Sequence, residues 1–156
     1  MNLNVLKKSR KTPKPGDIFV FQVEPDMFRF GRVIRTDARC GPIQGCILIY
    51  LYSTMSDDKH SIPDLNRDEL LIPPILTATK PWTEGVFETV VNRQLETSDV
   101  LPIHCFEHGK GRGEYYDADN NELAGPIEPV GRYALGNHRA IDQEISKALG
   151  FPIHET

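Results

Sequence analysis

The pattern of apolar and polar positions begins with two runs typical of paired β-strands. Asp17 to Glu24 and Met27 to Thr36 are dense in Phe, Val and Ile, and the turn-forming residues Pro25 and Asp26 separate them. A third run, Ile43 to Ser53, is apolar at most positions, so both of its faces should be covered. The pattern predicts an antiparallel hairpin, with the third strand near the middle of the same sheet.

A short helix is expected after the third strand. Ser61 is a favoured helix cap, Pro63 fits the first turn, and Asp64 is placed for a capping box. We expect this helix to end near Leu70.

The later segments predict more strands and one longer helix. The strand candidates are Ile75 to Thr79, Val86 to Asn92, Leu101 to Glu107, and Glu114 to Tyr116. Asn137 precedes a helical pattern of apolar positions from Ile141 to Leu149, and Gly150 closes it. The chain should therefore be α+β, with a strongly bent, mostly antiparallel sheet that could close into a barrel.

Gly31 interrupts the second strand. A glycine inside a strand indicates a bulge or a close approach of another group to the backbone. Phe28, Phe30 and Arg32 share one face of this strand, and the arginine lies where that face should leave the core. We expect Arg32 to pair with a carboxylate elsewhere in the domain. The hairpin would then mainly stabilise the fold rather than bind a partner.

Charge is distributed unevenly along the chain. The net charge is −4, but residues 1–14 hold five bases and no acid, which leaves residues 15–156 with 13 bases against 22 acids, a net of −9. This division predicts a flexible basic N-terminal tail, 1–14, followed by a single domain, 15–156. An acidic domain repels nucleic acid and favours basic partners.

Cysteine usage and hydropathy suggest a cytoplasmic protein. Cys40, Cys46 and Cys105 match no zinc or redox spacing, which fits a reducing compartment. The longest apolar run, Cys46 to Tyr52, is far shorter than the roughly 20 residues that cross a bilayer. We therefore expect no membrane partner. Binding to nucleic acid is not expected either, because the domain is acidic.

The segment from His104 to His108, HCFEH, is the densest cluster of metal-ligand types. On a strand its two histidines face the same side about 13 Å apart, too far to share one ion unless the chain bends at Phe106. No metal site and no cofactor are predicted. A metal site at these two histidines is kept as the alternative hypothesis.

Residues Asp117 to Glu128 partly match a calcium-binding EF-hand loop. Acidic and amide side chains stand at several ligand positions, but Glu122 occupies the position that needs glycine, and neither flank has a helical pattern. Asp and Asn also favour tight turns, and we interpret the segment as a hairpin turn.

The candidates for binding a partner are mostly acidic. They are Asp57, Asp58, Asp64, Asp68 and Glu69, together with the aromatic Trp82. A dense acidic run steers basic partners, and an exposed tryptophan would anchor them.

Several motifs, taken in order, resemble the immunity protein 26 family. They are Pro15-Gly16-Asp17-Ile18-Phe19, Phe28-Arg29-Phe30-Gly31-Arg32-Val33-Ile34, Pro63-Asp64-Leu65, Trp82 with the strand after it, and Tyr115-Tyr116-Asp117. The resemblance runs from Pro15 to about Leu149. The chain departs from the family pattern in its longer basic N-terminus and in Asp37 to Gly45, which looks like an inserted loop.

The resemblance implies a bacterial immunity protein that neutralises a cognate polymorphic toxin domain by stoichiometric binding. The family label also includes a phosphotriesterase-like lineage, so the alternative is a small metal-dependent hydrolase using His104 and His108. A third option is a binding module whose basic tail touches nucleic acid. Binding is favoured over catalysis, because the resemblance supplies no catalytic motif.

Overall fold

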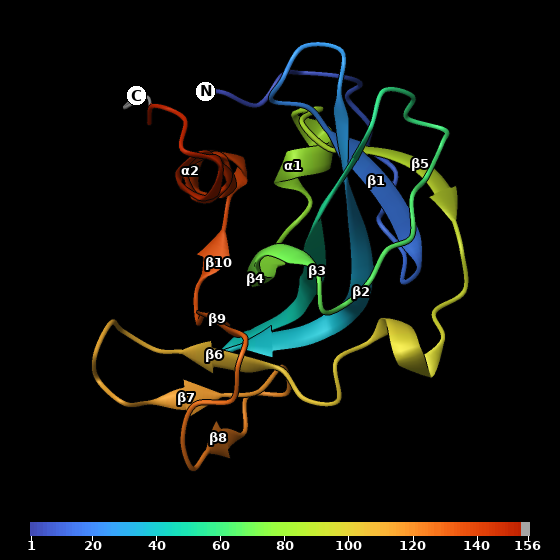
Figure 1. Cartoon of the computed structure of the whole chain (residues 1–156). Coiled ribbons are helices and arrows are strands. Elements are labelled where there is room, and N and C mark those ends of the chain that lie inside the picture. Colours follow the sequence, from blue (N-terminus) through green and yellow to red (C-terminus); the bar gives the residue numbers. More distant parts are fainter. Residues whose placement is uncertain (154–156) are drawn as a thin grey trace.

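The computed structural model describes residues 1–153, which form two β-sheets, two α-helices and one 3₁₀ turn (Figure 1). The larger sheet has the order β10 (Leu135–Gly136), β4 (Leu70–Thr77), β3 (Ile43–Ser56), β2 (Phe28–Cys40), β1 (Asp17–Phe21) and β5 (Glu88–Asn92). The smaller sheet has the order β8 (Glu122–Leu123), β7 (Tyr115–Tyr116), β6 (Cys105–Glu107) and β9 (Val130–Arg132). The helical elements are α1 (Lys80–Thr83), the 3₁₀ turn η1 (Thr97–Asp99) and α2 (His138–Leu149).

The predicted hairpin is confirmed by β1 and β2, which pair antiparallel. Asp26 in the turn between them has φ 61°, a left-handed conformation that Asp adopts more readily than most residues. Gly31 on β2 lies opposite Phe19 on β1. A side-chain carbon at Gly31 would lie 2.3 Å from the Phe19 ring, so the expected close approach is real and only glycine fits there.

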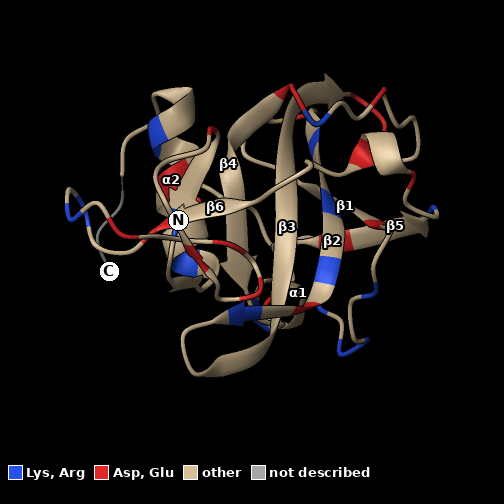
Figure 2. Cartoon of the chain, turned by 90° about the horizontal axis from the view of Figure 1, so that it is seen from below, with Lys and Arg blue, Asp and Glu red and all other residues tan. Residues whose placement is uncertain are grey.

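Strand β3 lies inside the larger sheet with both faces covered, as predicted. Every residue from Cys46 to Tyr52 is buried. Ile49 belongs to the core cluster that includes Ile145 of α2, whereas Tyr50 belongs to the cluster that includes Phe106 of the smaller sheet. Figure 2 shows β3 free of charged residues, while β2 beside it carries several arginines. β3 is therefore the common wall of two separate cores.

The segment Asp37 to Gly45 is a continuous hairpin rather than an inserted loop. β2 continues to Cys40 and β3 begins at Ile43, so only two residues form the turn. Several register shifts interrupt the β2–β3 pairing, and such irregularities bend and twist a two-stranded ribbon. The bend brings the end of this ribbon against the smaller sheet (Figure 1).

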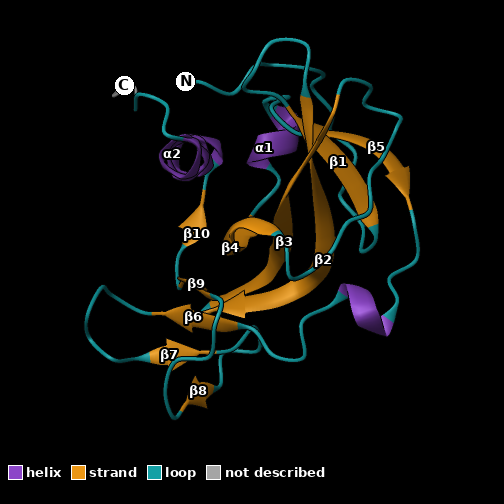
Figure 3. Cartoon of the chain, viewed as in Figure 1, coloured by secondary structure: helices purple, strands orange, loops and turns teal. Residues whose placement is uncertain are grey.

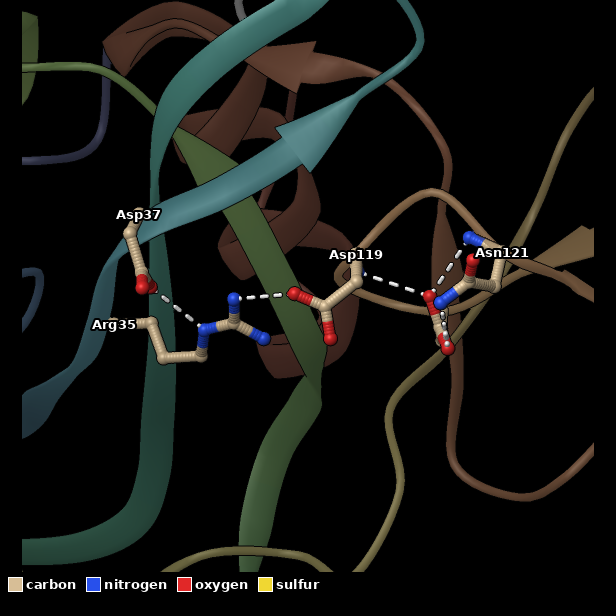
Figure 4. A network of polar contacts seen from close by, with 5 residues as sticks. Arg35, Asp37, Asp119 and Asn121 are labelled. Atoms are coloured by element: carbon tan, nitrogen blue, oxygen red, sulfur yellow. Dashed lines mark hydrogen bonds and ion pairs between the residues drawn. The ribbon is translucent and has the colours of Figure 1, made fainter.

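A polar network ties the β7–β8 turn to β2 (Figure 4). The guanidinium of Arg35 donates to Asp37 at 2.8 Å and to Asp119 at 2.6 Å. The hydrogen bond from Arg35 lowers the pKa of Asp119. This contact joins residues 84 positions apart and fixes the smaller sheet to the larger one.

Helix α2 forms as the sequence predicts. The Asn137 side chain accepts a hydrogen bond from the Ala140 N–H at 2.9 Å, and Gly150 ends the helix with φ 74°. Ile141 and Ile145 are buried against the larger sheet.

The expectation of a flexible tail is corrected for the first part of residues 1–14. Leu3 is only 4% exposed, and its N–H donates to the buried carboxylate of Asp142 on α2 at 2.7 Å. The N–H groups of Leu6 and Ser9 donate to backbone carbonyls in and just after α1. This segment therefore packs on the domain, although it contains no periodic apolar pattern.

The predicted fold class is confirmed, since the chain is α+β with a mostly antiparallel sheet, a short helix and a C-terminal helix (Figure 3). The β-strands form two sheets, not a closed barrel. The position predicted for the short helix is wrong, because Ser61 to Glu69 is irregular and the short helix is α1, which follows β4. Ile62 and Leu65 instead pack on a small core cluster around Phe30.

Candidate partner-binding surface

The acidic run forms most of the connection between β3 and β4. We call residues 57–69 the acidic loop. Its carboxylates all belong to exposed residues, namely Asp57, Asp58, Asp64, Asp68 and Glu69. With Lys59 and Arg67 as its only bases, the loop carries five acids against two bases, a net charge of −3 with His60 neutral.

Local hydrogen bonds hold the acidic loop in one conformation. The carboxylate of Asp58 accepts from the His60 N–H at 2.9 Å and from the Ser61 hydroxyl at 3.2 Å. These bonds lower the pKa of Asp58, so it is ionised at neutral pH. Farther on, the Asn66 side chain accepts from the Asp68 N–H at 2.8 Å. The loop is ordered by its own polar side chains rather than by a helix.

The two bases of the acidic loop are bound to the domain. Lys59 pairs with Glu88 of β5 at 3.0 Å. Arg67 donates to the backbone carbonyls of Thr97 and Val100. Within residues 1–153, the carboxylates of four members of the loop have no hydrogen bond or ion pair: Asp57, Asp64, Asp68 and Glu69. The surface therefore presents unpaired negative charge.

A hollow lies between the acidic loop and residues 93–99, and we call it the acidic hollow. Asp64, Arg67 and Asp68 line one wall, and Arg93, Ser98 and Asp99 line the other. The sequence did not indicate this second wall, because it comes from a separate part of the chain and contains no recognisable motif.

Arg32 lines the acidic hollow and is only 5% exposed. Its guanidinium forms an ion pair with Asp99 at 3.3 Å and donates to the Arg93 carbonyl at 2.8 Å. The expected pairing of Arg32 with a carboxylate of the domain is confirmed, and η1 supplies the partner. This bond fixes residues 93–99 against β2, so both walls of the hollow are held.

The role expected for Trp82 as an exposed anchor is wrong. Trp82 is 2% exposed and lies in the core, with its ring centroid 5.3 Å from those of Phe19 and Phe87. The N-terminal segment donates a hydrogen bond to the Trp82 carbonyl from Ser9, which helps to cover α1. A side chain buried in this way stabilises the fold and presents nothing to a partner.

The two histidines of the HCFEH segment occupy different environments. His104 is buried, its Nε2 lies 2.6 Å from the Tyr50 hydroxyl, and burial lowers its pKa to about 4. His108 is exposed, and its Nδ1 lies 3.1 Å from a carboxylate oxygen of Glu114. No three His, Cys, Asp or Glu side chains within residues 1–153 gather in a way that could hold a metal ion.

The segment that partly matches an EF-hand is a turn, as interpreted from the sequence. The Asp117 carboxylate accepts hydrogen bonds from the N–H groups of Asp119 and Asn121, both at 2.9 Å. Asn120 has φ 66°, the left-handed conformation typical of such turns. One carboxylate therefore caps its own turn.

The described residues also contain no helix long and apolar enough to span a membrane. The fold is that of a small α+β domain that presents an ordered, negatively charged loop.

Comparison with known families gives the class a name. The model of the family Immunity protein 26 matches residues 14–117, and the chain belongs to this family. The match covers β1 through β7 and both walls of the acidic hollow, and it ends before β8, β9, β10 and α2. No curated protein and no solved structure matches the chain. The family makes this chain an immunity protein, a class that acts by binding a toxin.

Proposed function

We propose that this immunity protein binds its cognate polymorphic toxin domain stoichiometrically in the cytoplasm, and that the acidic loop is the part of the surface the toxin meets first. One observation carries the proposal: the two bases of the loop are bound to the domain, while four of its five carboxylates are unpaired. A surface with this arrangement attracts a basic partner without rearranging its own ion pairs.

Electrostatic attraction of this kind acts mainly on the association rate. Complementary charge raises association rate constants from about 10⁵–10⁶ to about 10⁸–10⁹ M⁻¹s⁻¹ at low salt. Fast capture suits a protein that protects its own cell from a toxin. The effect depends on salt, because the Debye length falls from about 10 Å at 0.1 M to about 3 Å at 1 M.

The order of the acidic loop supports the same role. Its conformation is held by the Asp58 and Asn66 side chains and by the Ser53 N–H, which donates to the Glu69 carbonyl at 2.9 Å. Binding therefore orders few side chains, and the entropic cost of association is small.

The experiment compares two double variants of equal charge change. Asp64→Asn with Asp68→Asn removes two unpaired carboxylates from the loop, whereas Asp26→Asn with Glu122→Gln removes two exposed carboxylates elsewhere. The toxin domain encoded beside the gene is the partner, and stopped-flow fluorescence measures association at several salt concentrations. We expect the loop variant to associate about tenfold more slowly at low salt, with a flatter salt dependence.

The control variant should associate at nearly the wild-type rate, and both variants should keep the wild-type melting temperature. Asp64 caps no helix here, so its replacement has no structural cost of the kind the sequence suggested. Equal slowing by the two variants would show that only net charge matters and would place the contact elsewhere. Absence of any complex between the wild-type protein and the toxin domain would refute the proposed function itself.

A further inference from the structure

Strand β5 is the longest free strand edge in the part of the chain that the structure describes. It ends the larger sheet and pairs with β1 alone, and within residues 1–153 no backbone hydrogen bond joins its outer side to another segment. Figure 2 shows β5 at the margin of this sheet, beyond β1. The other edge strands, β8, β9 and β10, have only two or three residues each. A free edge offers unpaired N–H and C=O groups to another chain.

The sequence of β5 does not protect this edge. Natural edge strands commonly carry a lysine or a proline that prevents pairing with other chains. β5 contains neither, and the charge of Glu88 is held in the ion pair with Lys59 at 3.0 Å. The residues from Thr89 to Val91 are β-branched, a type that favours strands. The chemistry of β5 therefore permits an added strand.

A bulge in β5 determines which side chain an added strand would contact. The register of β1 against β5 shifts by one residue at Val90. Val90 packs on a small core cluster, whereas Val91 is 38% exposed. Because a bulge also twists the strand that carries it, we expect the added strand to be short, with about the five residues of β5.

The acidic loop lies beside this edge. The ion pair of Lys59 with Glu88 joins the loop to β5, and Ile62 of the loop packs on the same small cluster as Val90. The loop holds five acids and two bases, and residues 88–93 hold one acid and one base. The two segments together therefore have six acids against three bases, a net charge of −3 with histidine neutral.

This charge distinguishes between two possible occupants of the edge. Two copies of the chain that paired through β5 would be related by a two-fold axis at the junction. That axis would bring two acidic loops together, each with a net charge of −3, and like charges so placed repel. A basic segment of another protein meets no such repulsion and is attracted by the same charge. Charge complementarity thus favours a basic partner over a second copy.

We propose that β5 receives a short extended segment of the toxin as an added strand, with basic side chains toward the acidic loop and an apolar side chain beside Val91. This inference rests on the proposed function and adds the way in which the bound toxin is held. The acidic loop attracts the basic segment, and main-chain hydrogen bonds to β5 then hold it. Because side chains alternate between the faces of a strand, the basic and apolar residues on the loop side are two positions apart.

Amide hydrogen exchange measures the added strand directly. The partner is the toxin domain encoded beside the gene. We expect at least one amide of residues 88–92 that exchanges fast in the free protein to exchange about 100-fold more slowly in the complex. If the complex forms and no amide of residues 88–92 slows, the inference is wrong while the proposed function stands. Protection of these amides in a dimer of the protein alone would show self-pairing and would also refute it.

A lysine on the edge tests the same contact. Val91→Lys places a cation where the basic segment would lie, and Ile43→Lys makes the same charge change at the start of β3, at a residue that is 44% exposed. Both sites are on the surface, so both variants should melt near the wild-type temperature. We expect Val91→Lys to weaken the toxin complex about tenfold or more, and Ile43→Lys to weaken it less than about twofold. Equal weakening by the two variants would contradict the inference.

A peptide titration decides the inference if the wild-type protein binds no toxin and the proposed function fails. The peptide is acetylated and amidated, with the sequence Arg-Thr-Val-Thr-Arg, and NMR shifts of the labelled protein report its contacts. We expect shifts in both β5 and the acidic loop that follow one saturation curve. A peptide N-methylated at its three central residues, which cannot pair as a strand, should bind more weakly, as should one with glutamate in place of arginine. Shifts confined to the acidic loop, or equal binding of the N-methylated peptide, would overturn the inference.

Discussion

The N-terminal segment offers the sharpest test of the fold, because its first residues are anchored on one buried carboxylate, that of Asp142. Asp142 on α2 is 2% exposed and accepts hydrogen bonds from the N–H groups of Asn2, at 2.8 Å, and Leu3, at 2.7 Å. The Leu3 side chain then enters the core cluster that contains Trp82. We expect Leu3→Ala and Asp142→Ala each to destabilise the domain, although the sequence around Leu3 is typical of a solvated tail.

The structure sets the size of each effect. Leu3→Ala deletes a buried aliphatic side chain, and such changes cost about 2–5 kcal/mol of the free energy of unfolding. Asp142→Ala removes the acceptor of two hydrogen bonds to a charged group, each worth about 1.5–3 kcal/mol. The two losses should not add, since release of the segment by either change already removes the contacts that the other measures. The double variant should therefore cost clearly less than the sum of the single variants.

Urea unfolding followed by circular dichroism measures these free energies, and Val5→Ala is the matched control. Val5 is a neighbour on the same segment but is 58% exposed, so its replacement should change stability by less than about 0.5 kcal/mol. If Leu3→Ala were as mild as Val5→Ala, the segment would be solvated in solution and our account of its anchoring would be wrong. Fully additive effects would show that Asp142 and Leu3 act independently.

Two further predictions concern the interior. Burial lowers the pKa of His104 from 6.5 to about 4, so between these pH values the unfolded chain binds the proton more readily and stability falls with falling pH, by up to about 3 kcal/mol. His104→Phe should lack this part of the pH dependence when urea unfolding is compared at pH 7 and near pH 4, and equal slopes would contradict the assignment. Gly31→Ala should cost about 1–3 kcal/mol, because the added carbon overlaps the Phe19 ring, whereas Gly125→Ala, which meets no atom within 4 Å, should melt near the wild-type temperature.

The elements that the sequence predicts well are those with local signals. The hairpin of β1 and β2 has two apolar runs with a turn between them, and α2 has its cap residue Asn137 and its terminating Gly150. The predicted helix at Ser61 failed although its cap pattern was good. There Asp58 bonds to His60 and Ser61, and such side-chain bonds give the backbone an alternative to the helix.

The features that the sequence hides are long-range contacts. The anchor of Leu3 lies 139 residues away on α2, and no window of the sequence can show that pairing. Trp82 was expected at the surface, yet the N-terminal segment and the core aromatic residues enclose it. The acidic run was visible as a pattern of charge. The opposite wall of the acidic hollow depends on the ion pair of Arg32 with Asp99, which only the fold creates.

The position of the family match along the chain bears on the proposed capture of the toxin. The match, residues 14–117, includes both walls of the acidic hollow, whereas β8, β9, β10 and α2 lie beyond it. Complementary charge acts at a distance and raises the association rate of two proteins. Under the proposed function, the surface that the toxin meets first therefore belongs to the part of the chain that the family match covers.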